Sequence, residues 1–152
     1  MNLETKVPPP VVFLILAFAM AALARFSPHA PFDPSVRIPL AFAIIALGLM
    51  IGLLAFLHFQ TAKTTLDPVK IDAASALVTE GVYRFSRNPM YLGLTIMLVG
   101  WAIFLAAPWT AIGPAVFIAY ITQYQIEPEE RALTKKFGGA YRQYQLQTRR
   151  WI

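Results

Sequence analysis

The residues best suited to bind a ligand or take part in catalysis form two groups, and each group lies at the end of an apolar stretch. The first group runs from Gly81 to Gly93 and reads GVYRFSRNPMYLG. Pro89 restrains Asn88 to an extended backbone and can begin a helix, whose first N–H groups suit an anionic or polar ligand. Tyr83 and Tyr91 add flat aromatic faces that can contact a purine ring. The same residues also fit an ordinary membrane interface, where arginines and tyrosines are enriched.

The second group combines tyrosines with carboxylates. Tyr120, Tyr124 and Glu127 are spaced by four and three residues, so they share one face of a helix. Glu129 and Glu130 follow directly. Carboxylates beside a membrane attract a cation, and tyrosine rings add cation–π attraction. The alternative is a solvated helix start, where acidic residues are favoured by the helix dipole.

The composition limits where these two groups can act. The chain has 152 residues, of which 57% are hydrophobic and 14% charged, whereas a soluble domain carries about 25% charged residues. It contains no cysteine and two histidines, so disulfides and thiolate sites are excluded and no metal site is expected. The net charge of +5 fits a membrane surface better than nucleic acid. The sequence contains no dinucleotide fingerprint or P-loop, so any cofactor should bind among helices.

The apolar residues fall into four stretches that approach the length needed to cross a bilayer, which is about 20 residues. We expect spans over residues 11–26, 40–59, 90–107 and 109–126. Pro108 alone separates the last two spans, so they should form a tight helical hairpin. A signal peptide is the alternative for the first stretch, but the N-terminus carries Glu4 and Lys6 and lacks a small-residue cleavage site. The sequence therefore predicts a single-domain, all-α, multi-pass membrane protein over residues 1–152.

Basic residues predict the orientation of these spans, because Lys and Arg collect in cytoplasmic segments. With both termini in the cytosol, all 13 Lys and Arg residues except Arg25 and Arg37 fall on the cytoplasmic side. The chemistry then lies in a cytoplasmic loop (60–89) and a cytoplasmic tail (127–152). We expect the tail to form an amphipathic helix, a break at Gly138–Gly139 and a second helical piece. The residues near this second piece that suit lipid headgroups are Tyr141, Arg142, Tyr144, Arg149, Arg150 and Trp151.

Four segments in the second half of the chain, taken in order, match one known family. They are residues 76–83 (ALVTEGVY), residues 87–93 (RNPMYLG), Glu129–Glu130, and Phe137–Gly138 with Tyr141 and Tyr144. Together they resemble the isoprenylcysteine carboxyl methyltransferase family, which is related to the phospholipid N-methyltransferases. The resemblance runs from about Leu77 to Ile152, and the first two spans match only as apolar segments.

This resemblance implies an integral membrane enzyme that transfers a methyl group from S-adenosyl-L-methionine to a lipophilic acceptor and releases S-adenosyl-L-homocysteine. It also implies a cofactor pocket that opens to the cytosol and an acceptor that enters from the bilayer. The cofactor-binding residues implied by position are Ser75, Ala76, Leu77, Val78, Tyr83, Asn88, Pro89, Met90, Tyr91 and Glu129. The catalytic candidates are Glu130 and Gln125. Carboxylates and tyrosines near the positive sulfonium would stabilise its bound form.

Two positions depart from the family's usual pattern and leave the acceptor open. Asn88 stands where many members carry histidine, and asparagine keeps a donor and an acceptor but does not titrate. Gln125 stands where the prenylcysteine enzymes carry an arginine that holds the substrate carboxylate, and glutamine lacks that charge-assisted fork. An isoprenylcysteine carboxylate, a phospholipid amine and a thiol therefore remain as candidate acceptors.

A non-enzymatic membrane protein is the alternative to an enzyme. Gly48 and Gly52 form a GxxxG motif, through which membrane helices can pack closely. A scaffold or assembly partner could use this face to join other chains.

Overall fold

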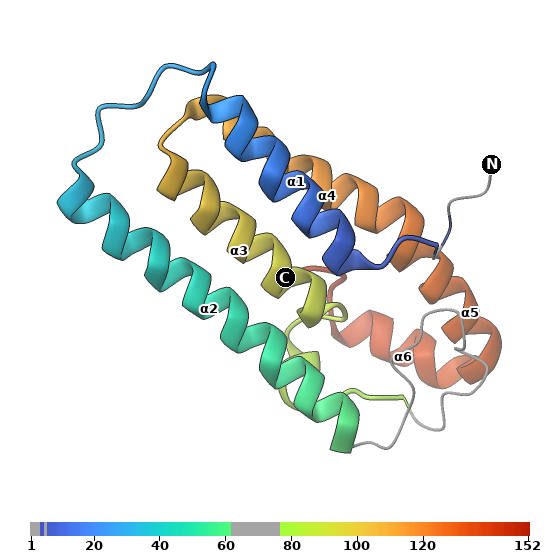
Figure 1. Ribbon diagram of the computed structural model, residues 1–152. Helices are drawn as coiled ribbons and strands as arrows, with labels where there is room; N and C mark the ends of the chain where they lie inside the picture. Colours follow the sequence, from blue (N-terminus) through green and yellow to red (C-terminus); the bar gives the residue numbers. More distant parts are fainter. Residues whose placement is uncertain (1–3, 5, 62–76) are drawn as a thin grey trace.

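Every described residue that lies in a secondary-structure element is helical in the computed structural model, which confirms the predicted all-α class (Figure 1). The structure describes residues 4, 6–61 and 77–152. The short elements labelled η are 3-10 helices, except η4, which is a π-helix. In chain order the elements are α1 (Pro9–Ala24), α2 (Pro34–Thr61), η2 (Gly81–Arg84), α3 (Pro89–Leu105), η3 (Pro108–Ala111), α4 (Ile112–Ile121), η4 (Thr122–Ile126), α5 (Glu127–Phe137) and α6 (Gly139–Gln147).

Helices α1 to α4 run side by side as a bundle, and α5 and α6 lie at one end of it (Figure 1). Helix α3 is central, because it contacts α1, α2 and α4. The indole N–H of Trp101 donates a hydrogen bond of 3.0 Å to the carbonyl oxygen of Ala17, which ties α3 to α1. The N-terminal segment, the start of α3 and the C-terminal segment meet at the α5–α6 end. The buried core side chains are Val12, Met20, Leu98, Phe117, Ile121 and Ile126.

Prolines mark where the long helices begin. Helices α1, α2 and α3 start at Pro9, Pro34 and Pro89, because the first residues of a helix need no intrahelical N–H and proline already has a helical φ. At the other end of α3, Ala106 adopts a left-handed backbone with φ of 51°. Pro108 then opens η3 within two residues. The predicted tight connection between the third and fourth apolar stretches is therefore confirmed.

Small residues allow α2 and α3 to approach closely. A Cβ on Gly48 would lie 2.6 Å from the carbonyl oxygen of Gly93, and a Cβ on Gly93 would lie 2.6 Å from that of Gly48 and 2.9 Å from the amide nitrogen of Gly52. Gly100 meets α2 in the same way, at the carbonyl oxygen of Ala41. At Gly48 the face predicted to join other chains is therefore occupied by α3 of the same chain, whereas a Cβ on Gly52 would meet no atom within 4 Å among the described residues.

One helix of the described residues, Pro34–Gln60, is long and apolar enough to cross a membrane, with a mean hydropathy of 2.8 over its most apolar window. It contains the predicted span 40–59. Helices α1 and α3 are apolar but have 16 and 17 residues. The predicted fourth span (109–126) is built from η3, α4 and η4 rather than one α-helix. The other three spans therefore stay predictions.

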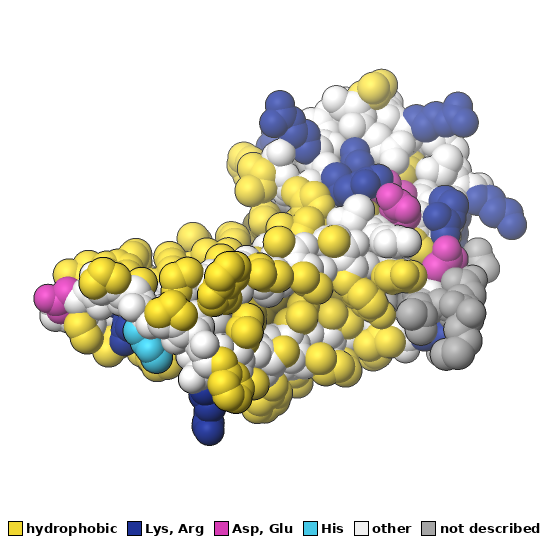
Figure 2. Space-filling view, turned by 90° about the horizontal axis from the view of Figure 1, so that it is seen from above, with side chains coloured by type: hydrophobic (Ala, Val, Ile, Leu, Met, Phe, Trp, Pro, Cys, Tyr) yellow, Lys and Arg dark blue, Asp and Glu magenta, His cyan; other side chains and the backbone are white. Residues whose placement is uncertain are grey.

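The surface of the bundle is apolar along most of its length. Figure 2 shows hydrophobic side chains over the elongated part of the molecule, with most charged side chains gathered at one end and a few at the other. Phe18 and Phe26, on or just after α1, are 74% and 89% exposed, and Phe42 on α2 is 59% exposed. Apolar surface of this extent indicates contact with a membrane or a partner rather than with water.

Candidate functional site

The loop that leads into α3 is anchored on the end of α2. Gly81 has a φ of +61°, which favours glycine, and a Cβ there would collide with the imidazole of His58. Tyr83 is 5% exposed. Its hydroxyl donates a long hydrogen bond of 3.5 Å to the carbonyl oxygen of Ala55, and its ring centroid lies 5.8 Å from that of Phe59. These contacts fix Tyr83, a predicted cofactor residue, beside the start of α3.

The C-terminal segment crosses the start of α3 and is bonded to it. The side-chain amide of Asn88 donates to the carbonyl oxygen of Arg150 at 2.9 Å, and the hydroxyl of Ser86 donates to the same oxygen at 3.4 Å. The backbone N–H of Arg87 donates to the carbonyl oxygen of Arg149 at 3.0 Å. The predicted cofactor residue Asn88 therefore lies at the α3 start with its amide turned to the C-terminal segment.

Glu129 is a partly buried carboxylate that contacts α3. The hydroxyl of Tyr91 donates to Oε1 of Glu129 at 2.6 Å. Burial raises the pKa of Glu129 from its ordinary value of 4.5 to about 7, the hydrogen bond from Tyr91 opposes this shift, and the charge of Glu130 adds to it. No ion pair joins Glu129 to a cation among the described residues. The carboxylate therefore favours a cationic ligand, which would restore its ordinary ionisation.

Glu130, the next residue, has cationic partners on both oxygens. Arg87 donates to Oε1 at 2.8 Å, and Arg150 donates to Oε2 at 2.7 Å. A third bond, from Nε of Arg150 to Oε1, measures 3.2 Å. Arg87 also donates to the carbonyl oxygens of Gln145 and Thr148. The charge of Glu130 is thus matched within the protein, and the residue joins α5 to the start of α3 and to the C-terminal segment.

Gln125, the other predicted catalytic residue, lies in the π-helix η4 and is 1% exposed. Its side-chain nitrogen donates to the carbonyl oxygen of Val7 at 2.7 Å. Its side-chain oxygen has no hydrogen-bond partner among the described residues. Single π-helical turns inside longer helices are frequent at functional sites. The side-chain oxygen of Gln125 is therefore a buried hydrogen-bond acceptor that no described residue uses.

The tail's tyrosines are inside the protein, so their predicted position at the lipid headgroups is wrong. Tyr141 and Tyr144 are 2% and 6% exposed. The hydroxyl of Tyr144 donates to the carbonyl oxygen of Tyr83 at 2.6 Å, and burial raises the pKa of Tyr141 to about 12. Trp151 packs against the core, and Arg150 pairs with Glu130. An amphipathic aromatic side chain suits either a headgroup zone or a core that offers its hydroxyl a partner.

For the remaining predicted cofactor residues, the structure gives burial alone or does not describe the position. Ser75 and Ala76 lie outside the described residues. Leu77, Val78 and Met90 are described and partly buried. Pro89, the first residue of α3, is buried.

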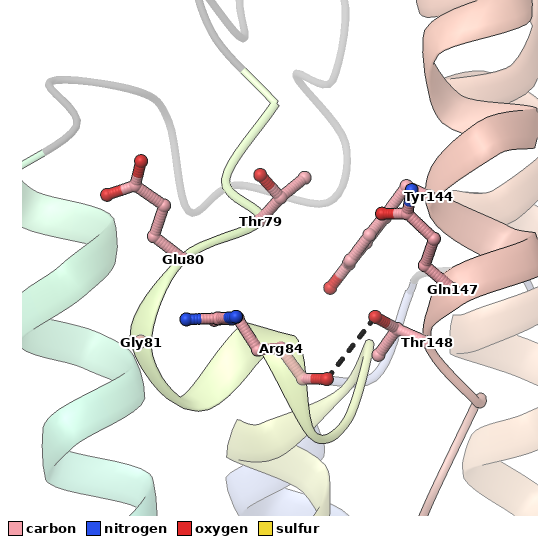
Figure 3. Close-up of a pocket in the computed structure, with 7 residues that line it drawn as sticks. All are labelled: Thr79, Glu80, Gly81, Arg84, Tyr144, Gln147 and Thr148. Atoms are coloured by element: carbon pink, nitrogen blue, oxygen red, sulfur yellow. Dashed lines mark hydrogen bonds between the residues drawn. The ribbon is translucent and has the colours of Figure 1, made fainter.

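A cavity of about 580 Å³ lies between η2 and α6 (Figure 3). None of its lining residues was assigned to the cofactor from the sequence, although Thr79, Glu80, Gly81 and Arg84 lie within the quoted motifs, and Gln147 and Thr148 were missed altogether. The hydroxyl of Thr148 donates to the carbonyl oxygen of Arg84 at 3.4 Å across one side of it. The lining residues are Thr79, Glu80, Gly81, Arg84, Tyr144, Gln147 and Thr148.

Comparison with known proteins adds to this geometry. The sequence profile of the phospholipid methyltransferase family matches residues 36–140. The chain is 34% identical over 101 residues to protein-S-isoprenylcysteine O-methyltransferase B of Arabidopsis thaliana, and 33% identical to form A. Each alignment covers 66% of this chain and 51% of the plant protein, so the chain spans about half the length of these relatives. An uncharacterized protein of Haemophilus influenzae is 41% identical over its full 63 residues, which cover 41% of this chain.

Proposed function

The chain belongs to the phospholipid methyltransferase family, and on that premise we propose that it is an integral membrane enzyme that transfers a methyl group from S-adenosyl-L-methionine to a lipophilic acceptor. The matched region contains both polar groups, residues 81–93 and Glu129–Glu130. The names of the plant relatives support the same class of reaction. The acceptor is an isoprenylcysteine carboxylate, a phospholipid amine or a thiol.

The observation that carries this proposal is the partly buried carboxylate of Glu129 beside Tyr91. It has no cation among the described residues, and a fixed positive charge would offset the cost of burying it. The methyl donor supplies that charge, because its sulfonium is positive. We assign Glu129 and Tyr91 to the charged centre of the cofactor and Asn88 to its polar groups. Tyr83, with Leu77 and Val78 of the preceding loop, supplies an aromatic and apolar wall for the adenine.

The cofactor supplies an activated methyl group, so the protein needs to align the acceptor rather than provide a nucleophile. Alignment alone can lower a barrier by about 7–11 kcal/mol. Glu130 holds α5 against α3 through Arg87 and so keeps the neighbouring Glu129 in place. We assign the buried side-chain oxygen of Gln125 to the methyl-accepting substrate, where it can accept a hydrogen bond from an N–H or S–H group of that substrate.

We place the chain in the membrane as four spans, with both termini and the site in the cytosol. The apolar surface of the bundle, the gathering of charge at one end (Figure 2) and the length of α2 support this arrangement. Since the site lies at the charged end, the cofactor can enter from water and the acceptor from the bilayer. A scaffold function is less well supported, because α3 already occupies the Gly48 part of the GxxxG face.

Binding of S-adenosyl-L-homocysteine and S-adenosyl-L-methionine to detergent-purified protein tests the proposal. Wild type should bind both, and Glu129→Gln should weaken binding of the cationic methyl donor by about tenfold or more. Glu127→Gln is the matched control, because Glu127 is about half exposed and pairs loosely with Arg150 at 3.9 Å. The absence of binding or thermal stabilisation by millimolar ligand in wild type would overturn the proposal.

The acceptor class is tested by methyl transfer from tritiated cofactor. Purified protein should label one of three acceptors: a prenylcysteine, a phospholipid with a primary amine, or a lipophilic thiol. If the protein binds the cofactor but labels none of the three, the acceptor belongs to a different chemical class.

A further inference from the structure

The cavity between η2 and α6 is lined by two side chains of opposite charge. Glu80 and Arg84 both line it and are both exposed. Neither side chain has an ion pair or a side-chain hydrogen bond with any residue in the described part of the chain. They extend from the two ends of one short turn (Figure 3). Two opposite charges that stand apart in one cavity are complementary to a ligand that carries both charges itself.

Neutral donors and a fixed shape complete the cavity. Hydroxyl groups of Thr79, Tyr144 and Thr148 line it. The Tyr144 hydroxyl is bonded to the backbone of η2 at 2.6 Å, and that of Thr148 at 3.4 Å, so α6 and η2 hold the cavity between them. Its volume of about 580 Å³ falls within the range of about 300–1,000 Å³ that is typical of small-molecule sites.

The cavity adjoins residues already assigned to the cofactor. Thr79 directly follows Val78, and Tyr83 lies between Glu80 and Arg84 in the chain. The carbonyl oxygen of Tyr83 accepts the bond from Tyr144 on the cavity side. The charges of Tyr144 and of Glu129 both raise the pKa of Tyr83, after the larger effect of burial. Tyr83 is thus bonded to a cavity residue and also lies within electrostatic range of Glu129.

We propose that this cavity binds the amino-acid end of the methyl donor, with Arg84 on its carboxylate and Glu80 on its ammonium group. The proposal rests on the proposed function and extends the cofactor site to Glu80 and Arg84, which the family resemblance did not assign to the cofactor. The chemistry recognised is a zwitterion with its two charges a few bonds apart. The headgroup of a zwitterionic phospholipid shares that chemistry, so the experiment must separate the two sources.

The test compares two ligands that differ only at the amino-acid end. S-adenosyl-L-homocysteine carries this end, whereas 5′-methylthioadenosine lacks it and keeps the adenosine and the sulfur. Arg84→Ala should weaken binding of the first ligand by about tenfold, the effect of losing one charge-assisted contact, and that of the second by less than twofold. Glu80→Gln should act in the same direction with a smaller effect, and Arg84→Lys should recover part of the loss because it keeps the charge.

Arg142→Ala on α6 is the matched control, since Arg142 is exposed and does not line the cavity. It should leave both affinities unchanged. Equal losses for both ligands in Arg84→Ala, or no loss for either, would overturn the inference while the proposed function stands. Wild type that binds neither ligand would instead overturn the proposed function. If added phosphatidylethanolamine competes with S-adenosyl-L-homocysteine in wild type but not in Arg84→Ala, the cavity takes a lipid headgroup and the inference is wrong.

Discussion

Glu129 and Glu130 are adjacent in the chain, and their surroundings are opposite. Glu129 is partly buried, accepts one hydrogen bond from Tyr91 and has no ion pair with a cation in the described structure. Glu130 has an arginine on each oxygen, at 2.8 and 2.7 Å. The sequence places two equivalent acids in one helical turn. The fold pairs Glu130 with two arginines and leaves Glu129 without an ion pair, which is why we propose Glu129 for the positive centre of the cofactor.

The difference shows that the role of a charged side chain depends on whether the protein supplies an opposite charge beside it. A paired carboxylate inside a protein holds elements together, and removing it leaves its partners unpaired. An unpaired one costs stability, and a protein keeps it where a ligand supplies the missing charge. Four substitutions or conditions can break or sharpen this contrast, beginning with the largest expected effect.

Removing Glu130 should destabilise the end of the molecule where α5, the start of α3 and the C-terminal segment meet. Glu130→Ala leaves Arg87, which is 12% exposed, without its carboxylate and releases Arg150 from the C-terminal segment. We expect a loss of about 2–3 kcal/mol in the free energy of unfolding, below the range for fully buried pairs because Arg150 is 35% exposed. Thermal denaturation in detergent measures it. Arg131→Ala, which breaks the exposed pair with Glu4, should change little, and an equal loss there would contradict the contrast.

Removing the charge of Glu129 should increase the free energy of unfolding, whereas removing Glu130 should decrease it. Because its folded-state pKa of about 7 lies above the ordinary 4.5, the protonated form is favoured in the fold. The contribution of the Glu129 carboxyl group to stability is therefore most favourable below about pH 4.5 and is lost as the pH rises through about 7. Glu129→Gln should therefore stabilise the cofactor-free protein by about 2 kcal/mol at pH 8 and by almost nothing at pH 4.5. Unfolding midpoints across this range would show it, and a destabilised variant at pH 8 would contradict it.

Local signals in the sequence predicted the parts of the fold that depend on neighbouring residues. Proline at the helix starts, the glycine with φ of +52° after α5, and the Asn88–Pro89 entry to α3 were all foreseeable. Tyr91 and Glu129 were both assigned to the cofactor from their motifs, and the structure brings them into contact.

The parts that could not be predicted depend on contacts between distant segments. Arg87 and Arg150 are 43 and 20 residues from Glu130, and nothing in a local pattern shows that the C-terminal segment returns to α3. The same holds for Gly48, whose partner Gly93 lies on another helix. Tyr141 and Tyr144 carry equal preference for an interface and for a polar core, so only the packing of α6 decides between them.

Cofactor binding should depend on pH because it requires the ionised form of Glu129. With a pKa of about 7, only about one tenth of the carboxylate is ionised at pH 6. Affinity for S-adenosyl-L-methionine should therefore rise by up to about tenfold between pH 6 and pH 8. S-adenosyl-L-homocysteine lacks the sulfonium charge and should show a weaker dependence. Titration calorimetry at several pH values measures both ligands, and a pH-independent affinity in wild type would show that Glu129 does not face the charge.

The smallest expected effect concerns the hydrogen bond that orients Glu129. Tyr91→Phe removes the 2.6 Å bond to Oε1, which favours the charged carboxylate, so the pKa of Glu129 should move further upward. At pH 7 the affinity for S-adenosyl-L-methionine should fall about fivefold, which corresponds to about 1 kcal/mol. Much of this loss should disappear at pH 9, where the carboxylate ionises again. Tyr124→Phe is the control, because its ring packs on Tyr120. If the loss in Tyr91→Phe were the same at every pH, Tyr91 would contact the cofactor directly rather than act through Glu129.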